Sequence, residues 1–287
     1  MKVIVAKTAG FCFGVRRAVE AVERELTKKK GPIYTYGPII HNEEVVRDLS
    51  ERGVGVVNDL SELLTLPKGT IVLRSHGVSR ADAEEMKKAG FTVVDAACPF
   101  VKRIHELVSR YTEEGFDVII IGNAGHPEVE AIRSYGEEGR IFVIGDEEEA
   151  RGFVLKKKTV VVAQTTASLT KFKDLVEIIQ KKEYDGIGYG VVVENTICSA
   201  TKERQEEAAR IALDADAMIV IGGAQSSNTR KLFEICKELC PNSHYIQTKR
   251  DLHVHLLRNC DCIGITAGAS TPTNIIEEVQ KHVRNEF

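Results

Sequence analysis

An internal repeat at a spacing of 100 residues constrains the fold of this 287-residue chain more than any other feature. The segment VDAACPFVKR (94–103) aligns with ENTICSATKE (194–203), so that Cys98 falls on Cys198. At the same spacing IGNAGHPE aligns with IGGAQSSN, which pairs His126 with Ser226 and Glu128 with Asn228. Self-similarity at a fixed period indicates a chain built from copies of one supersecondary unit.

The N-terminal segment provides a third copy, in which Cys12 is followed by GPIIHNE (37–43). The interval from cysteine to the matched polar residue is 29 residues from Cys12 to His41, 28 from Cys98 to His126 and 28 from Cys198 to Ser226. In each copy a strand end with small polar residues then precedes a helix: LRSHGVS (73–79), AQTTAS (163–168) and TAGASTP (266–272). We therefore expect three similar α/β units, at residues 1–95, 96–193 and 194–287.

The whole chain alternates short β-branched runs with helical patterns, which is typical of a mainly parallel α/β protein. The expected strands are Val3–Ala6, Ile33–Tyr36, Thr70–Leu73, Thr92–Val94, Val118–Ile121, Ile141–Ile144, Val160–Ala163, Val191–Val193, Met218–Ile221, His244–Ile246 and Cys262–Ile265. The clearest expected helices are Gly14–Lys29, Val101–Glu113, Thr201–Leu213 and Asn274–Arg284.

The charge and hydropathy of the chain argue against several classes of partner. A net charge of −3 provides no polybasic field for nucleic acid or an anionic membrane. No apolar run reaches the about 18 residues of a membrane-spanning helix. The first apolar run is also too short for a secretory signal. We therefore expect a cytoplasmic protein that binds neither nucleic acid nor a membrane.

The arrangement of three of the seven cysteines suggests a metal site, since disulfides are rare in a reducing cytosol. Cys12, Cys98 and Cys198 each follow a strand and precede a helix, where loops form the binding crevice of parallel sheets. Around a pseudo-threefold axis the three thiols would meet at one point. Thiolates with little accompanying histidine favour an iron–sulfur cluster or zinc. Three protein ligands on a four-iron cluster leave one iron open.

The same symmetry brings polar residues to that point, most of them at predicted helix N-termini, where free N–H groups favour anions. They are His41, His76, His126, Thr165, Thr166, Ser226, Ser227, Asn228 and Ser270. Such a set, without a P-loop lysine, suits a phosphate or diphosphate. Glu128 is the acid best placed to lie in a substrate cavity there, and we expect it to be kept protonated near the metal and the bound anion and to deliver protons.

Each of these residues also has an ordinary structural interpretation. Taken alone, Ser226, Thr166 and Ser270 are typical helix N-caps, and Glu128 is a typical first-turn acid. The shared intervals favour a common function, because independent caps have no reason to share spacings with three cysteines.

The remaining cysteines have no counterparts in the other copies. Cys236 and Cys240 are four residues apart on a predicted helix, which indicates buried side chains. Cys260 and Cys262 flank an aspartate at the start of a strand, and a metal role for them is the minor interpretation. The spacing from Cys198 to Arg204 matches cysteine phosphatases, but the glycines of a phosphate loop are absent.

Nine motifs together resemble those of the 4-hydroxy-3-methylbut-2-enyl diphosphate reductases, over nearly the whole chain. They are AGFCFGVRR (9–17), YGPIIHN (36–42), RSHG (74–77), DAACP (95–99), GHPE (125–128), AQTT (163–166), NTIC (195–198), SSNTR (226–230) and TAGASTP (266–272). Ala97 departs from the pattern, since the family more often has threonine before this cysteine. The resemblance implies a three-domain trefoil of α/β units around a central iron–sulfur cluster, in agreement with the repeat.

The resemblance also implies an activity and its residues. It implies that Cys12, Cys98 and Cys198 hold a 4Fe–4S cluster whose fourth iron takes the substrate hydroxyl. Two electrons and protons then remove the hydroxyl as water, giving isopentenyl and dimethylallyl diphosphate in the non-mevalonate pathway of isoprene biosynthesis. It implies a proton relay by Glu128 with Thr165, and diphosphate contacts from His41, His76, His126, Ser226, Ser227, Asn228 and Ser270. An external electron donor, such as a ferredoxin or flavodoxin-type protein, is expected because the sequence contains no nicotinamide fingerprint.

Three other functions stay open at this point. An aconitase-like hydro-lyase would use the open iron only as a Lewis acid and would need no reductant. An iron–sulfur sensor or binding protein for a phosphorylated ligand would bind without turnover. A structural zinc site would contain zinc and no acid-labile sulfide.

Overall fold

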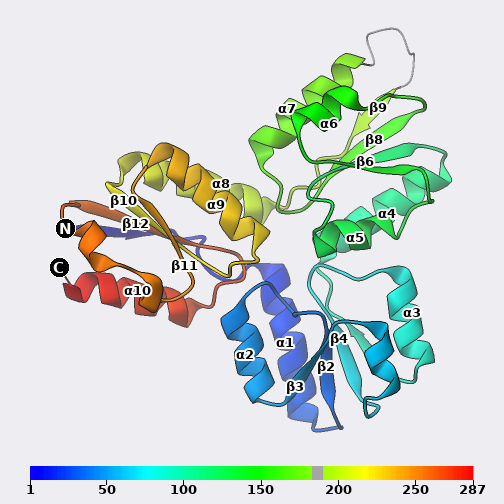
Figure 1. Cartoon of the computed structure of the whole chain (residues 1–287), viewed down its shortest axis with the longest axis horizontal. Coiled ribbons are helices and arrows are strands. Elements are labelled where there is room, and N and C mark those ends of the chain that lie inside the picture. The colour runs from blue at the N-terminus through cyan, green and yellow to red at the C-terminus, as the bar shows by residue number, and fades with distance from the viewer. Residues whose placement is uncertain (183–189, 287) are drawn as a thin grey trace. The chain divides into compact units, whose positions relative to one another are not determined.

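The computed structural model describes residues 1–182 and 190–286, and its strands form three four-stranded sheets (Figure 1). The strand pairs in all three sheets are parallel. This confirms the α/β class and the three similar α/β units. The expected strands are all present to within two residues at either end, and one further strand appears.

The first sheet has the strand order β3-β2-β4-β5. Its strands are β2 (Ile33–Tyr36), β3 (Val54–Val57), β4 (Thr70–Leu73) and β5 (Thr92–Asp95). The chain before and between them forms α1 (Phe13–Lys28), α2 (Glu43–Glu51), the 3-10 helix η1 (Leu60–Leu64) and α3 (Arg80–Lys88). β3 was not predicted, because Gly55 interrupts its apolar run. The glycine makes room for a neighbouring ring, since a Cβ atom on Gly55 would lie 2.7 Å from Cδ1 of Tyr34.

The second sheet has the order β7-β6-β8-β9 and is covered on both faces. Its strands are β6 (Asp117–Ile121), β7 (Ile141–Ile144), β8 (Thr159–Ala163) and β9 (Val191–Val193). Its helices are α4 (Pro99–Glu113), α5 (Pro127–Arg133), α6 (Glu147–Gly152) and α7 (Leu169–Lys182). Val118 and Ile120 pack with α4 and α5, whereas Ile119 and Ile121 pack with α6 and α7. Burial on both faces explains the near-continuous apolar runs of β6 and β8.

The third sheet has the order β1-β12-β10-β11 and takes one strand from the other end of the chain. Its strands are β1 (Lys2–Val5), β10 (Ala217–Ile221), β11 (Ser243–Ile246) and β12 (Cys262–Ala267). Its helices are α8 (Ser199–Asp214), α9 (Ser227–Leu239), η3 (Lys249–Asp251), η4 (Val254–Leu257) and α10 (Thr273–Glu286). Figure 1 shows α8 and α9 on one face of this sheet and α10 on the other. Because β1 pairs with β12, the N-terminal strand completes the sheet of the third copy.

The chain forms two compact units, which we name by their sheets. The one-sheet unit consists of Met1–Arg16, Ile40–Arg52 and Ser199–Phe287 and contains the third sheet. The two-sheet unit consists of Arg17–Ile39 and Gly53–Cys198 and contains the other two. The boundaries expected after residues 95 and 193 stay a prediction.

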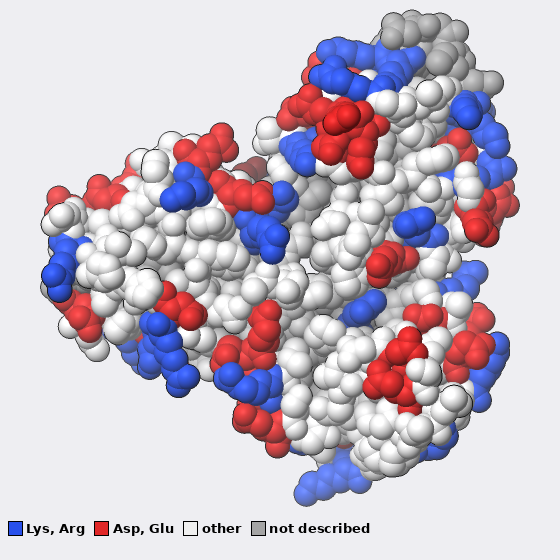
Figure 2. All heavy atoms as spheres, in the orientation of Figure 1, with Lys and Arg blue, Asp and Glu red and all other residues white. Residues whose placement is uncertain are grey.

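The surface carries charges of both signs. On the face drawn in Figure 2, Lys and Arg side chains are interspersed with Asp and Glu. Within residues 1–182 and 190–286, no helix has the combination of length and apolarity that crossing a membrane requires.

Candidate active site

The three repeated cysteines share one backbone anchor. The amide N–H of Cys12 donates to the carbonyl oxygen of Ala269 (3.1 Å), that of Cys98 to Ser75 (3.0 Å) and that of Cys198 to Thr165 (3.2 Å). Each acceptor lies in the loop directly after a neighbouring strand, namely β12, β4 or β8. The repeat seen in the sequence is therefore a repeat of hydrogen-bonded loop pairs.

Each anchor also places a predicted ligand-binding residue beside a cysteine. Ser270, His76 and Thr166 directly follow the three acceptors in the chain. The three cysteine side chains are partly exposed and form no disulfide within the described chain. Partly exposed thiols on anchored loops at the carboxyl edges of parallel sheets suit the soft-ligand role predicted for them.

Glu128, in the first turn of α5, is almost fully buried, with 1% of its surface exposed. Thr165 holds both carboxylate oxygens: its backbone N–H donates to Oε1 (2.6 Å) and its hydroxyl donates to Oε2 (2.8 Å). Burial raises the pKa of Glu128 to about 7, although the two hydrogen bonds from Thr165 act in the opposite direction. A carboxyl group with this pKa exchanges its proton near neutral pH, as a general acid must. The structure thus brings together the two residues predicted to relay protons.

His126 is the N-cap of α5 and lies beside a second predicted ligand-binding histidine. Its Nδ1 accepts a hydrogen bond from the backbone N–H of Glu128 (3.1 Å). Because Nδ1 accepts, the ring proton is on Nε2, which makes that atom a donor. The rings of His126 and His76 are 5.5 Å apart between centroids and meet edge to face.

Thr166 is held by a buried glutamine that the sequence patterns did not single out. Gln164 Nε2 donates to the Thr166 hydroxyl (3.1 Å), while its Oε1 accepts from the backbone N–H of Asn123 (3.2 Å). Through these two hydrogen bonds Gln164, which is 2% exposed, connects the loop after β8 to the loop after β6. The available signal was a polar side chain at the end of a fully buried strand.

In the one-sheet unit, Ser226 is the N-cap of α9 and Ser227 is the first residue of that helix. The Ser226 hydroxyl oxygen accepts from the backbone N–H of Thr229 (3.2 Å). Asn228 is 4% exposed, and neither atom of its side-chain amide has a hydrogen-bond partner among the described residues. Burying an amide without partners costs free energy. A bound ligand or an ordered water can complete the hydrogen bonds of this amide, and the diphosphate-binding role of Asn228 stays a prediction.

His41 lies next to Ser270 and to the loop that leads to Asn228. The Ser270 hydroxyl donates to the backbone carbonyl of His41 (2.9 Å). A Cβ atom on Gly223 would lie 2.7 Å from that same carbonyl oxygen, so the glycine allows the close approach. Three loops of the one-sheet unit therefore meet at the His41 backbone.

Arg204 supports the Cys12 loop and was assigned no role from the sequence. It is 4% exposed, and its guanidinium donates to the carbonyl oxygen of Gly10. Gly10 has a φ of +107°, which favours glycine. The spacing between Cys198 and Arg204 thus has a structural explanation, and the missed signal was an arginine on the buried face of a helix.

Cys236 and Cys240 are buried beside Met218 in the core under α8 and α9, as predicted. Burial raises the pKa of Cys236 to about 12, so this thiol stays protonated and unreactive. Cys260 and Cys262 are partly buried.

The predicted site residues fall into two groups. The two-sheet unit contains Cys98, Cys198, His76, His126, Glu128, Thr165 and Thr166. The one-sheet unit contains Cys12, His41, Ser226, Ser227, Asn228 and Ser270. The meeting of the three thiols at one point stays a prediction.

Comparison with known proteins identifies the family. The model of the LytB protein family matches residues 3–284. The 4-hydroxy-3-methylbut-2-enyl diphosphate reductase of Geobacter metallireducens is 44% identical over 285 residues, covering 99% of this chain and 97% of that protein. The enzyme of the same name from Pelobacter propionicus is 45% identical over 285 residues, covering 99% and 98%.

Solved structures agree with the sequence comparison. An (E)-4-hydroxy-3-methyl-but-2-enyl diphosphate reductase, described as the terminal enzyme of the non-mevalonate pathway, is 39% identical with a TM-score of 0.69, covering 99% of this chain and 100% of that one. The E-1-hydroxy-2-methyl-but-2-enyl-4-diphosphate reductase from Plasmodium falciparum is 30% identical with a TM-score of 0.88, covering 99% and 87%. The chain belongs to the LytB family of 4-hydroxy-3-methylbut-2-enyl diphosphate reductases.

Proposed function

We propose that the chain reduces (E)-4-hydroxy-3-methylbut-2-enyl diphosphate to isopentenyl diphosphate and dimethylallyl diphosphate. The allylic C–O bond breaks, the hydroxyl leaves as water, and two electrons and two protons are consumed. Family membership supports this activity. The structural observation that best supports it is the state of Glu128. This acid is buried, its pKa is raised to about 7, and both of its carboxylate oxygens accept hydrogen bonds from Thr165.

A 4Fe–4S cluster fits the residues present, with Cys12, Cys98 and Cys198 as its three protein ligands. The three thiols are partly exposed and outside disulfides, and their loops share one anchor. When bound, such a cluster supplies electrons and an open, Lewis-acidic iron that eases cleavage of the C–O bond. The electrons come from an external donor, such as a ferredoxin or flavodoxin-type protein.

The diphosphate is bound by histidine, serine, threonine and asparagine side chains, with no lysine or arginine among them. The residues assigned to it are His41, His76, His126, Thr166, Ser226, Ser227, Asn228 and Ser270. His126 donates through Nε2, because its Nδ1 already accepts from the Glu128 backbone. Asn228 has an unsatisfied amide, and it lies in the first turn of the 13-residue helix α9, where free N–H groups favour anions.

Glu128 supplies a proton through Thr165. The Thr165 backbone N–H fixes Oε1, so the orientation of the carboxyl group is set before substrate arrives. The Thr165 hydroxyl contacts Oε2, and it can take a proton from the protonated carboxyl group while giving up its own. The pair is buried, with Glu128 1% and Thr165 6% exposed, and this burial limits loss of the proton to solvent.

Anaerobic reconstitution with iron and sulfide, followed by assay with a chemical electron donor, tests this function. We expect both isoprenoid diphosphates to form only when the donor is present. Turnover without a donor would indicate a hydro-lyase, and binding without turnover would indicate a sensor or binding protein. Zinc without acid-labile sulfide would indicate a structural metal site.

A further inference from the structure

We propose that a stacked pair of side chains, His105 and Tyr135, positions His76 for binding the substrate diphosphate. We call this pair the aromatic clasp. Neither residue belongs to the predicted site, and both act through the loop that carries His76. The proposal rests on the proposed function for the ligand that His76 binds.

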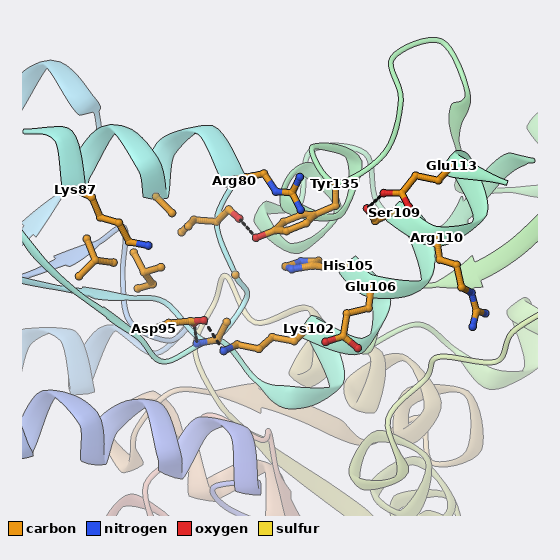
Figure 3. A pocket seen from close by; sticks show the side chains of 16 residues that line it. Arg80, Lys87, Asp95, Lys102, His105, Glu106, Ser109, Arg110, Glu113 and Tyr135 are labelled. Carbon is orange, nitrogen blue, oxygen red and sulfur yellow. Dashed lines mark hydrogen bonds and ion pairs between the residues drawn. The ribbon is translucent and has the colours of Figure 1, made fainter. Parts of the chain in front are cut away.

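The clasp joins two helices that carry site residues. The rings of His105 and Tyr135 are stacked at 3.9 Å between centroids and 12° between planes, and Figure 3 shows them face to face. His105 lies on α4, the helix that begins directly after Cys98. Tyr135 lies two residues beyond the end of α5, the helix that His126 caps.

Both members of the clasp contact the loop after β4, one and two residues beyond His76. The Tyr135 hydroxyl donates to the carbonyl oxygen of Val78 (3.4 Å). The His105 ring lies so close to Gly77 that a Cβ atom there would be 2.8 Å from its Cε1 and 3.3 Å from its Nε2. Gly77 also has a φ of +76°, so this position suits only glycine. The loop is thus shaped to receive the His105 ring.

The loop is fixed on the other side of His76 as well. There the carbonyl oxygen of Ser75 accepts a hydrogen bond from the backbone N–H of Cys98 (3.0 Å). On the clasp side of His76, Arg74 Nε donates to the carbonyl oxygen of Gly77 (3.1 Å). His76 therefore lies between one point held by the Cys98 loop and another held by the clasp. Loss of the clasp leaves the Cys98 anchor and the Arg74 bond intact, and it removes the contacts of His105 with Gly77 and of Tyr135 with Val78.

Burying the His105 ring costs free energy, because one of its polar atoms has no hydrogen-bond partner among the described residues. Its side chain is 5% exposed, and its Nε2 has no hydrogen-bond partner within the described parts of the chain. Burial lowers the pKa of His105 to about 4, so the ring is neutral near pH 7. A neutral ring stacks on Tyr135 and packs on Gly77 without bringing a charge into the loop.

The clasp lines a groove in the two-sheet unit that differs from the predicted site. The groove encloses about 530 Å³, and its described lining contains no predicted site residue (Figure 3). It does contain Gly77 and Ala97, the chain neighbours of His76 and Cys98. Substitutions in the clasp therefore affect the site only through neighbouring residues such as Gly77, and they remove no predicted substrate contact.

The test is the dissociation constant for inorganic diphosphate, measured by calorimetry on the anaerobically reconstituted protein. His105→Ala should weaken binding about tenfold, a loss of about 1.4 kcal/mol, because the loop that carries His76 loses its contact with the His105 ring. Tyr135→Phe keeps the stack and loses one long hydrogen bond, so it should retain most of the affinity. Ser109→Ala, on α4 and in the same groove, should bind as the wild type does. In the reductase assay, His105→Ala should raise KM and change kcat much less.

Two outcomes separate this proposal from the function on which it rests. Wild-type affinity in His105→Ala, with weakened binding in His76→Ala, overturns the clasp alone, even if the melting temperature falls. Wild-type affinity in His76→Ala overturns the assignment of His76 to the diphosphate, and the clasp with it. If His105→Ala does not fold, Tyr135→Leu compared with Tyr135→Phe decides: weaker binding in the leucine variant supports the clasp, and equal binding overturns it.

Discussion

The loops after β6 and β10 share the same backbone hydrogen bonds, but they differ in whether a buried polar side chain has hydrogen-bond partners. The N–H of Gly122 donates to Ile144 (3.2 Å), and that of Gly222 donates to Ile246 (2.9 Å). Further along, the N–H of His126 donates to Asn123 and that of Ser226 to Gly223, both at 3.0 Å. Two segments 100 residues apart thus follow one turn geometry into a helix.

The difference lies two residues after the N-cap. Glu128 is buried with both oxygens bonded to Thr165, so we call its loop the closed copy. Asn228 is buried with both amide atoms unpartnered among the described residues, so we call its loop the open copy. The same backbone frame therefore carries a hydrogen-bonded carboxyl group in one copy and, among the described residues, an unpartnered amide in the other. The repeat therefore fixes the position of each side chain, while the side chain and its neighbours decide the chemistry.

Among the substitutions proposed, Glu128→Gln in the closed copy should lower kcat the most. The amide can still accept from the Thr165 backbone but cannot deliver a proton, so kcat should fall by about 10²- to 10⁴-fold. Substrate affinity, measured by calorimetry without a reductant, should stay close to that of the wild type. A variant that keeps most of the wild-type kcat would remove Glu128 from the proton relay.

The stability of the protein should depend on pH through Glu128. The pKa of Glu128 in the folded protein, about 7, lies above the ordinary 4.5. Its contribution to the free energy of unfolding is therefore complete below pH 4.5 and is lost as pH rises through about 7. At 1.36 kcal/mol per pKa unit, the loss is roughly 3 kcal/mol. Urea unfolding at pH 5 and pH 8 should show most of this loss in the wild type and in the exposed control Glu148→Gln, but not in Glu128→Gln. The same pH dependence in all three proteins would mean that Glu128 titrates normally.

Asn228→Ala, in the open copy, should change KM and leave kcat nearly unchanged, which is the reverse of the effect expected for Glu128→Gln. Hydrogen bonds to a charged ligand contribute about 1.5–3 kcal/mol, so KM should rise by about 10- to 100-fold. The change in kcat should be small, and so should the change in melting temperature, because the amide has no hydrogen-bond partner to lose among the described residues. A lower melting temperature with an unchanged KM would show that Asn228 is structural.

Thr165→Val tests whether the Thr165 hydroxyl takes part in proton transfer from Glu128. The change removes the hydroxyl bonded to Oε2 and keeps the backbone N–H bonded to Oε1. That hydroxyl lowers the pKa of Glu128, so its loss should raise the pKa and move the basic limb of the kcat profile to higher pH. We expect kcat to fall about tenfold, or about 1.4 kcal/mol, with recovery in Thr165→Ser. A shift of the limb to lower pH would contradict the relay.

The strands and the frame of the site could be predicted because their signals are local or repeated. Apolar runs such as those of β6 and β8 are readable from a short window. The equal cysteine intervals locate the loops at strand ends, and N-cap residues such as Ser226 mark helix starts. β3 escaped because the residue that fits the Tyr34 ring, Gly55, also breaks the strand pattern.

The energetic details could not be predicted, because they depend on long-range contacts. The bonds between Glu128 and Thr165 join residues 37 positions apart, and they decide which oxygens are satisfied. The contact of Arg204 with Gly10 spans 194 positions. A helical pattern shows that such side chains lie on a buried face, but it does not show which partner they meet.

The equivalence of the three cysteines is tested most directly by metal content. Iron and acid-labile sulfide per chain should be measured after anaerobic reconstitution in Cys12→Ser, Cys98→Ser and Cys198→Ser. The control is Cys262→Ser, a partly buried cysteine outside the repeat. We predict that each of the three variants loses most of its iron and sulfide, while the control keeps the wild-type content. Wild-type content in any one of the three, or zinc without sulfide in the unaltered protein, would contradict a cluster held by the repeat.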